Sequence, residues 1–279
     1  MEAIYNLMEQ LICFEWIQYD FMKNALLAII CIVPLFGILG TMIVNNKLAF
    51  FSDALGHSAF TGMAIGVILG VSNVDISMVI FGIIFAIILN FIKSKKTAST
   101  DTIISVFASL STAIGLVILS RGGNFANYSS LLVGDILSIT IKEIIYLLVI
   151  LVVTIVFWLV TYNQLHAVSM SESIARSRHI KVKIIETIFS ILIALVVMCS
   201  IKWVGMLIIN ALLILPAAAS RNISNNIREY HLFSVMISFV TSIMGLIVSY
   251  YIDTATGPTI AIFAALVFFS TLVIKPYVK

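Results

Sequence analysis

A carboxylate and an imidazole stand four residues apart inside a long apolar stretch of the chain. Asp53 and His57 lie in the run from Phe50 to Val71, where hydrophobic and small residues otherwise dominate. In a helix of ~3.6 residues per turn, residues at positions i and i+4 lie on one face, about one turn apart. Carboxylate oxygen and imidazole nitrogen are both ligands of zinc, manganese and iron. The spacing therefore predicts that both side chains can hold one divalent cation.

Two other interpretations of the pair stay open at this point. A charged side chain near the centre of a bilayer costs about 2.5 to 3.5 kcal/mol unless it faces a cavity or a partner. Asp53 could cap the start of its helix while His57 bonds to a neighbouring helix, or the pair could relay a proton. Because two ligands do not complete a metal site, we expect the others from water or from Asn210 and Asp253.

Composition places these residues in a membrane. Of the 279 residues, 61% are hydrophobic and only 10% are charged, and the mean hydropathy is +1.15. These values exclude a soluble globular domain. Apolar runs of roughly 18 to 22 residues can each cross ~30 Å of hydrocarbon as a helix. We predict an all-α, polytopic transmembrane bundle of eight or nine helices, at 24–44, 50–71, 75–92, 101–119, 139–161, 184–201, 204–220, 231–251 and 257–274.

Two segments are expected to lie at the membrane surface. Residues 1–23 are acidic and lack a basic start, so they do not resemble a signal peptide and are predicted to form an interfacial segment. Residues 131–140, which carry Gly134 and Asp135, are predicted to form a short interfacial or re-entrant piece. Asp135 and Asp253 both stand at the ends of apolar segments, where capping is the favoured role for a carboxylate.

The net charge, the cysteines and the absence of a nucleotide-binding motif exclude further classes of protein. The net charge of +3 is carried by loops, which indicates orientation in a membrane and no nucleic-acid binding. Basic residues gather at 93–96, 176–183, 221–228 and 275–279, so these segments are predicted to be cytoplasmic. The 3 cysteines are too few and too scattered for a disulfide framework. The sequence has no GxxxxGK[ST] motif, so any ATPase must be a separate subunit.

The segment after the seventh apolar stretch combines small, basic and polar residues. Pro216 is expected to kink or end its helix. Residues 217–230, which include Arg221, Arg228 and Glu229, follow it. They form either an ordinary basic loop or a short helix that docks into a partner protein.

Four stretches of the chain share a pattern with one family of membrane proteins. Residues 52–62 resemble GDAxSHAxxPG, 134–137 match GDIL, 204–221 resemble VGxLLxxALLxxPAAxAR, and 251–257 are similar to a Tyr-Asp-x-x-x-Gly pattern. These are motifs of the membrane permeases of metal-ion ABC importers, which carry zinc, manganese or iron. The departures of the chain from the first pattern include Ser52, Gly56 and Thr61, where the family usually has Gly, Ser and Pro.

The resemblance implies a type II-like importer permease in which 1–279 form a single transmembrane domain of a multi-pass protein in the bacterial cell membrane. Two copies would form an alternating-access pathway among the membrane lipids, served by an extracytoplasmic metal-binding receptor and by cytoplasmic ATP-binding subunits. The chain itself would be no enzyme and would hold no permanent cofactor, since the metal is its cargo. Asp53 and His57 fall on the metal pathway of the family, and 217–230 on its ATPase-coupling loop.

Two competing classes make other use of the same pair. A secondary cation carrier would couple ions or protons through Asp53 and His57 without any ATPase. A membrane scaffold would use the pair only to specify helix packing.

Overall fold

The computed structural model describes residues 2–11, 14–95, 99–121, 130–206 and 208–278. Over these ranges the chain is helical and contains no strand. The elements are α1 (Glu2–Leu11), η1 (Glu15–Gln18), α2 (Asp20–Asn45), α3 (Ala49–Ile68), α4 (Val74–Ser94), α5 (Thr100–Arg121), α7 (Ser130–Val133), η2 (Ile136–Ser138), α8 (Ile141–Met170), α9 (Glu172–Ser177), α10 (Val182–Val204), α11 (Ile209–Ile223), α12 (Ile227–Ile252) and α13 (Thr256–Val278).

Seven helices of the described chain are long and apolar enough to cross a membrane: α2, α4, α5, α8, α10, α12 and α13. All nine predicted segments coincide with helices, which confirms the all-α membrane class. The expected count of eight or nine spans is slightly too high by this criterion. α11 has only 15 residues, and α3 has 20 residues but includes Asp53, His57 and several small or hydroxylated residues that lower its hydropathy.

The chain folds into two compact units. Unit 1 contains residues 1–41, 133–153 and 202–279, and unit 2 contains residues 42–132 and 154–201. The chain passes from one unit to the other inside helices, within α2, α7, α8 and α10.

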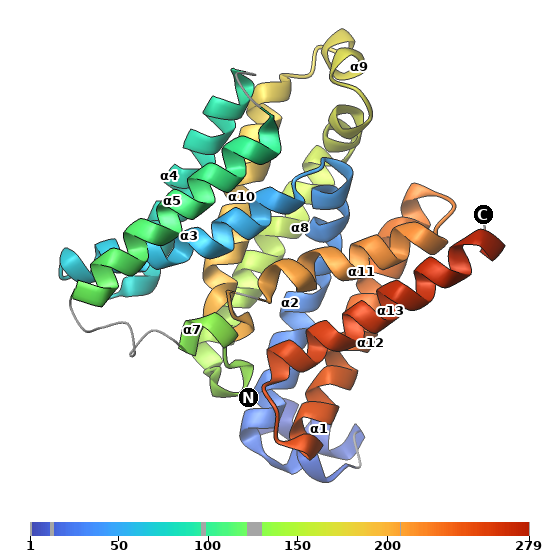
Figure 1. Ribbon diagram of the computed structural model, residues 1–279. Coiled ribbons are helices and arrows are strands. Elements are labelled where there is room, and N and C mark those ends of the chain that lie inside the picture. The colour runs from blue at the N-terminus through green and yellow to red at the C-terminus, as the bar shows by residue number, and fades with distance from the viewer. Residues whose placement is uncertain (1, 12–13, 96–98, 122–129, 207, 279) are drawn as a thin grey trace. The chain divides into compact units, whose positions relative to one another are not determined.

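In unit 2, α3 packs against both α4 and α5 (Figure 1). Glycines allow the close approach: a Cβ on Gly62 would lie 2.9 Å from Met78 Cα of α4, and one on Gly115 of α5 would lie 2.7 Å from the Thr61 backbone nitrogen. The Ser77 hydroxyl donates to the carbonyl of Gly62 at 2.7 Å. α3 is therefore held on two faces by backbone-to-backbone packing.

In unit 1, α13 packs against α11 and α12, which also contact each other (Figure 1). Glycines of α2 approach the same helices. A Cβ on Gly37 would lie 2.8 Å from Val235 Cα of α12, and one on Gly40 would lie 2.0 Å from the Leu213 carbonyl oxygen of α11. The Ser234 hydroxyl donates to the Gly37 carbonyl at 2.9 Å. Unit 1 is thus a bundle joined by close contacts and buried polar bonds.

Two glycines determine where α10 ends and α11 begins. Gly134 has φ +72° and Gly205 has φ +91°, in the left-handed region that glycine tolerates best. A Cβ on Gly205 would lie 2.2 Å from the Val133 carbonyl oxygen, so the two segments touch through their backbones. The helix predicted to begin at residue 204 therefore begins at Ile209, because a left-handed glycine cannot continue an α-helix.

The N-terminal helix is tied to the start of α2 by a buried lysine. Lys23 Nζ lies 2.6 Å from Glu9 Oε1 of α1 and 3.0 Å from Asp20 Oδ1. Its ammonium also lies 5.2 Å from the ring centroid of Tyr5. The prediction that residues 1–23 lie at the membrane interface stays a prediction, but α1 is held by contacts to the bundle.

Candidate functional site

α3 places the predicted metal ligands side by side. Asp53 and His57 lie one turn apart, with 3.8 Å between Asp53 Oδ2 and His57 Nε2. Their side chains are 45% and 37% exposed, whereas the residues around them on the helix, 54–56 and 58–64, are buried. The helix therefore presents both ligands on a single accessible face.

This face is a narrow stripe that α4 and α5 leave uncovered. Phe50 is exposed, and Asp53 and His57 follow it at helical spacing. On the buried faces the hydroxyls serve packing, since Ser58 donates to the Leu55 carbonyl at 2.8 Å and Thr61 donates to the Ser111 carbonyl of α5. The acidic and basic groups of α3 thus point away from its packing contacts.

The geometry suits a shared cation with a small adjustment. Two ligand atoms ~2.1 Å from one metal are about 3.0 to 3.4 Å apart at octahedral or tetrahedral angles. The observed 3.8 Å between Asp53 Oδ2 and His57 Nε2 exceeds this by about 0.4 to 0.8 Å, and it is too long for a direct hydrogen bond. No group of three or more His, Cys, Asp or Glu side chains that could hold a metal occurs among the described residues. One chain therefore offers two adjacent candidate ligands, and a metal held by them would have further coordination positions open.

The two further candidate ligands belong to unit 1, whereas Asp53 and His57 belong to unit 2. Asn210 was expected midway along a span, but it lies in the first turn of α11 because that helix begins only at Ile209. Asp253 was expected to cap the last helix. It forms instead the left-handed C-cap of α12, with φ +53°, and its backbone N–H donates to the Ser249 carbonyl.

Asp135 has the capping role that the sequence favoured. It is the N-cap of η2, and its carboxylate accepts a hydrogen bond from the Leu137 backbone N–H at 3.0 Å. The segment predicted as a short interfacial or re-entrant piece contains two short helices, α7 and η2.

Residues 217–230 form the tip of a helical hairpin. α11 continues through Pro216 to Ile223, so this proline does not end the helix, and α12 begins at Ile227. Glu229 closes the turn: its carboxylate accepts from the Asn225 backbone N–H at 2.9 Å and from the Asn226 side-chain amide at 2.7 Å. Asn226 in return accepts from the Glu229 backbone N–H at 2.9 Å, a reciprocal cap.

The charged side chains of this hairpin therefore divide into two kinds. Glu229 is hydrogen-bonded within the turn, and Arg221 and Arg228 are exposed at its surface. Both arginines are accessible to a partner protein.

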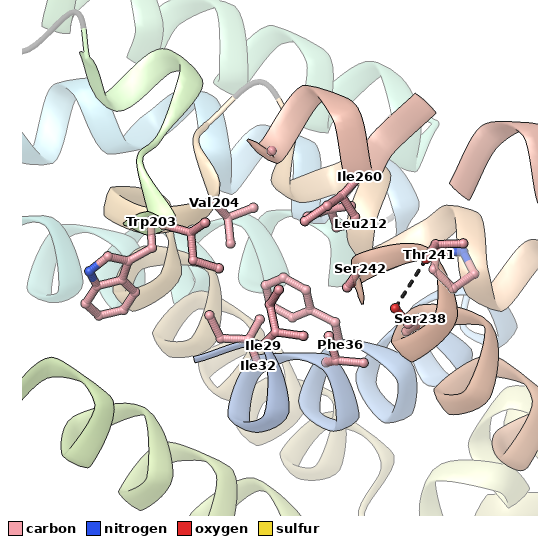
Figure 2. Close-up of a pocket in the computed structure, with 14 residues that line it drawn as sticks. Ile29, Ile32, Phe36, Trp203, Val204, Leu212, Ser238, Thr241, Ser242 and Ile260 are labelled. Atoms are coloured by element: carbon pink, nitrogen blue, oxygen red, sulfur yellow. Dashed lines mark hydrogen bonds between the residues drawn. The ribbon is translucent and has the colours of Figure 1, made fainter. Parts of the chain in front are cut away.

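Unit 1 also contains a small, partly open cavity of about 30 Å3 between α2, the end of α10, α11, α12 and α13 (Figure 2). Its wall is apolar apart from the hydroxyl-bearing side chains of Ser238, Thr241 and Ser242, and its described lining includes no carboxylate and no imidazole. Since one water needs roughly 10–15 Å3 of such volume, the cavity has room for about two or three waters. Its described lining lacks the ligands of a metal site.

Sequence reasoning missed one buried polar contact in unit 1. Thr41 Oγ1 of α2 lies 2.7 Å from His231 Nδ1 of α12, and both residues are buried. The sequence shows only a histidine at the start of an apolar stretch. This position does not identify the residue that bonds to it.

Comparison with known proteins agrees with this fold. A model of the ABC 3 transport family matches residues 18–275. The chain is 32% identical over 259 residues to the high-affinity zinc uptake system membrane protein ZnuB of Haemophilus influenzae, covering 91% of this chain and 97% of that protein. It is 27% identical over 259 residues to the manganese import system permease protein ScaB of Streptococcus parasanguinis, covering 93% and 92%.

A solved structure has the same fold as this chain. The chain matches the structure of PsaBC from Streptococcus pneumoniae in complex with Fab with a TM-score of 0.81 and 25% identity, over 97% of this chain and 95% of that chain. Together with the family match, this confirms the resemblance seen in the four sequence motifs.

Proposed function

The chain belongs to the ABC 3 transport family, and from that membership we propose that it forms the divalent-metal pathway of an ATP-driven importer. It is a multi-pass protein of the bacterial plasma membrane. Its relatives are membrane subunits, so ATP hydrolysis belongs to a separate partner. The relatives are named for zinc and manganese uptake, and these two metals, with iron as the third that His and carboxylate ligands suit, are the proposed cargo.

The observation that supports this proposal most strongly is the Asp53 and His57 pair on the open stripe of α3. A charged group in a membrane helix needs a partner, a cavity or an ion, and here the two groups face away from α4 and α5. One carboxylate and one imidazole per chain bind a metal weakly enough to release it, in contrast to a cage of four thiolates. Such a pair suits passage of a metal ion.

The open coordination positions favour a second copy of the chain as partner. Two copies would contribute two Asp53 and two His57 side chains, which is enough for four-coordinate binding. An extracytoplasmic receptor would deliver the metal. ATP-binding subunits would bias the outward-facing and inward-facing states, because a ligand that binds one state better shifts the population toward that state.

Radiometal uptake into vesicles tests the site. The chain is reconstituted with its ATPase and receptor, and uptake of zinc and manganese is compared among wild type, Asp53→Ala and His57→Ala at equal protein content. We expect both variants to lose uptake, whereas Asp101→Ala, which removes an exposed carboxylate of the same unit, should transport normally. Near-normal uptake by both α3 variants would remove the site assignment. Proton-driven uptake by the chain alone would favour a secondary carrier instead.

We assign the ATPase contact to the hairpin at 217–230 because it presents two exposed arginines on a rigidly capped turn. The double variant Arg221→Ala, Arg228→Ala should lose the ATPase during co-purification or lose metal-stimulated ATP hydrolysis. Lys95→Ala, at an exposed basic position outside the hairpin, is the matched control. Unchanged co-purification together with unchanged stimulation would reject the assignment.

A further inference from the structure

A buried hydrogen bond joins the N-terminal part of α12 to α2. Thr41 Oγ1 and His231 Nδ1 are 2.7 Å apart, although 190 residues separate them in the chain. Thr41 is 0% exposed and His231 is 7% exposed. The Thr41 hydroxyl donates its one proton to the Ile38 carbonyl at 2.6 Å. With its proton used in this way, the hydroxyl oxygen accepts from the imidazole in the tautomer that carries a proton on Nδ1.

Neighbouring bonds connect this contact to the hairpin at 217–230. The Tyr230 hydroxyl lies 3.5 Å from the Thr41 carbonyl oxygen, and the Ser220 hydroxyl of α11 donates to the Tyr230 carbonyl at 2.6 Å. Both sides of the hairpin tip are thus bonded to each other, and its α12 side is bonded to Thr41. A buried polar network of this kind holds one arrangement, because each broken bond would leave an unpaired polar group.

Thr41 occupies a special place along α2. It is the last residue of unit 1, and Met42 begins unit 2, yet the helix continues unbroken to Asn45. α2 then ends in a tightly bonded turn: Leu48 N–H donates to the Ile43 carbonyl at 2.9 Å and Lys47 N–H to the Val44 carbonyl at 3.3 Å, with Lys47 at φ +56°. This is the Schellman arrangement, and α3 begins directly after it at Ala49.

The chain between Thr41 and Asp53 is therefore helix, bonded turn and helix, without a loose linker. A displacement of α2 at Thr41 would reach α3 through this continuous hydrogen-bonded backbone. Contiguous rigid elements of this kind are what carries energetic coupling between distant sites.

Resting on the proposed function, we infer that Thr41 and His231 are positioning residues of the transport cycle. They pass movement of the hairpin at 217–230 to α2, and through the turn at Lys47 to the helix that carries Asp53 and His57. A purely structural role would make the same bond, but it would leave the amount of metal moved per ATP unchanged.

The test measures ATP hydrolysis and metal uptake in the same vesicles, with the chain, its ATPase and its receptor reconstituted together. Thr41→Val and His231→Leu remove the bond. A buried hydrogen bond typically shifts an equilibrium by roughly fivefold, so metal moved per ATP should fall about fivefold while hydrolysis continues. Thr41→Ser keeps the hydroxyl, and His231→Asn keeps an N–H donor near the Nδ1 position, so both should restore most of the ratio.

The control variant lies at the other end of α12. Ser249→Ala removes a buried hydroxyl pair, Ser249 with Thr256 at 3.0 Å, and should leave metal per ATP unchanged. The inference is overturned if Thr41→Val and His231→Leu lower hydrolysis and uptake together at a constant ratio, or leave both unchanged. If either variant fails to fold, the metal moved per ATP is measured for Thr41→Ala instead, and the same outcomes apply. Absence of ATP-driven uptake by the wild-type complex would instead overturn the proposed function.

Discussion

Replacing Gly115 by alanine tests whether α5 and α3 touch through their backbones. The added Cβ would lie 2.7 Å from the Thr61 nitrogen and 2.8 Å from the Phe60 carbonyl carbon. Both are main-chain atoms, so no side-chain rotation relieves the overlap. Ordinary contact begins near 3.4 Å, so the two helices must separate by about 0.7 Å at this point, one turn beyond His57.

The expected loss follows from three contributions. Overpacking of this kind costs about 1 to 3 kcal/mol. The Ser111 hydroxyl, which donates to Thr61 Oγ1 at 3.0 Å, moves out of hydrogen-bond range, which costs about 1 kcal/mol. Alanine is favoured over glycine in a helix by about 1 kcal/mol, which offsets the lost bond. We expect Gly115→Ala to lower the free energy of unfolding by about 1 to 3 kcal/mol.

The assay is denaturant-driven unfolding in mixed micelles. The sign of the change in the free energy of unfolding decides the outcome. Gly82→Ala is the matched control, because the three atoms nearest to its Cβ belong to the flexible side chain of Met198, the first of them 2.6 Å away, and none of the three is a backbone atom. That variant should unfold at the same or higher denaturant concentration. A Gly115→Ala protein as stable as wild type, or more stable, would refute the close approach, because helix propensity alone predicts a gain.

Two further predictions concern α12. Ser234→Ala removes the donor to the Gly37 carbonyl and should lower the free energy of unfolding by about 1 kcal/mol, whereas Ser238→Ala, one turn later, removes a buried hydroxyl that has no partner in the described part of the chain and should cost nothing. Equal losses in micelle unfolding would contradict this difference. Asn226→Ala removes the N-cap of α12 and should cost about 1 kcal/mol. Limited proteolysis at 224–226 should accelerate, and an unchanged cleavage rate would show that the turn does not need this cap.

The sequence predicts the helices well because their signal is local. Nine apolar segments were expected and each coincides with a helix, since hydropathy and length are properties of a single stretch. The same local reasoning places Asp53 and His57 on one face, because helical geometry alone brings positions i and i+4 together. Whether that face stays open depends on where α4 and α5 pack, and the sequence does not show this.

The errors arise where distant segments meet. The start of α11 was predicted five residues too early because Gly205 packs against Val133 and Gly134, about 70 residues away. The stretch from 204 to 209 is apolar and has no local signal for a left-handed residue apart from the glycine itself. The Thr41 and His231 contact was missed for the same reason, because neither residue is unusual within its own helix.

α3 carries the proposed ligands. Among the long helices of the described chain, it is the one that does not count as a membrane span by its apolar content. Asp53 and His57 make this helix costly to expose to lipid by itself, and α4 and α5 contact its backbone at Gly62 and near Thr61. Because those contacts cover only two faces, the stripe with Asp53 and His57 must meet water, an ion or another protein surface, since lipid would leave both groups unsolvated. A helix stabilised by packing on two faces and by solvation on the third is what a metal pathway requires.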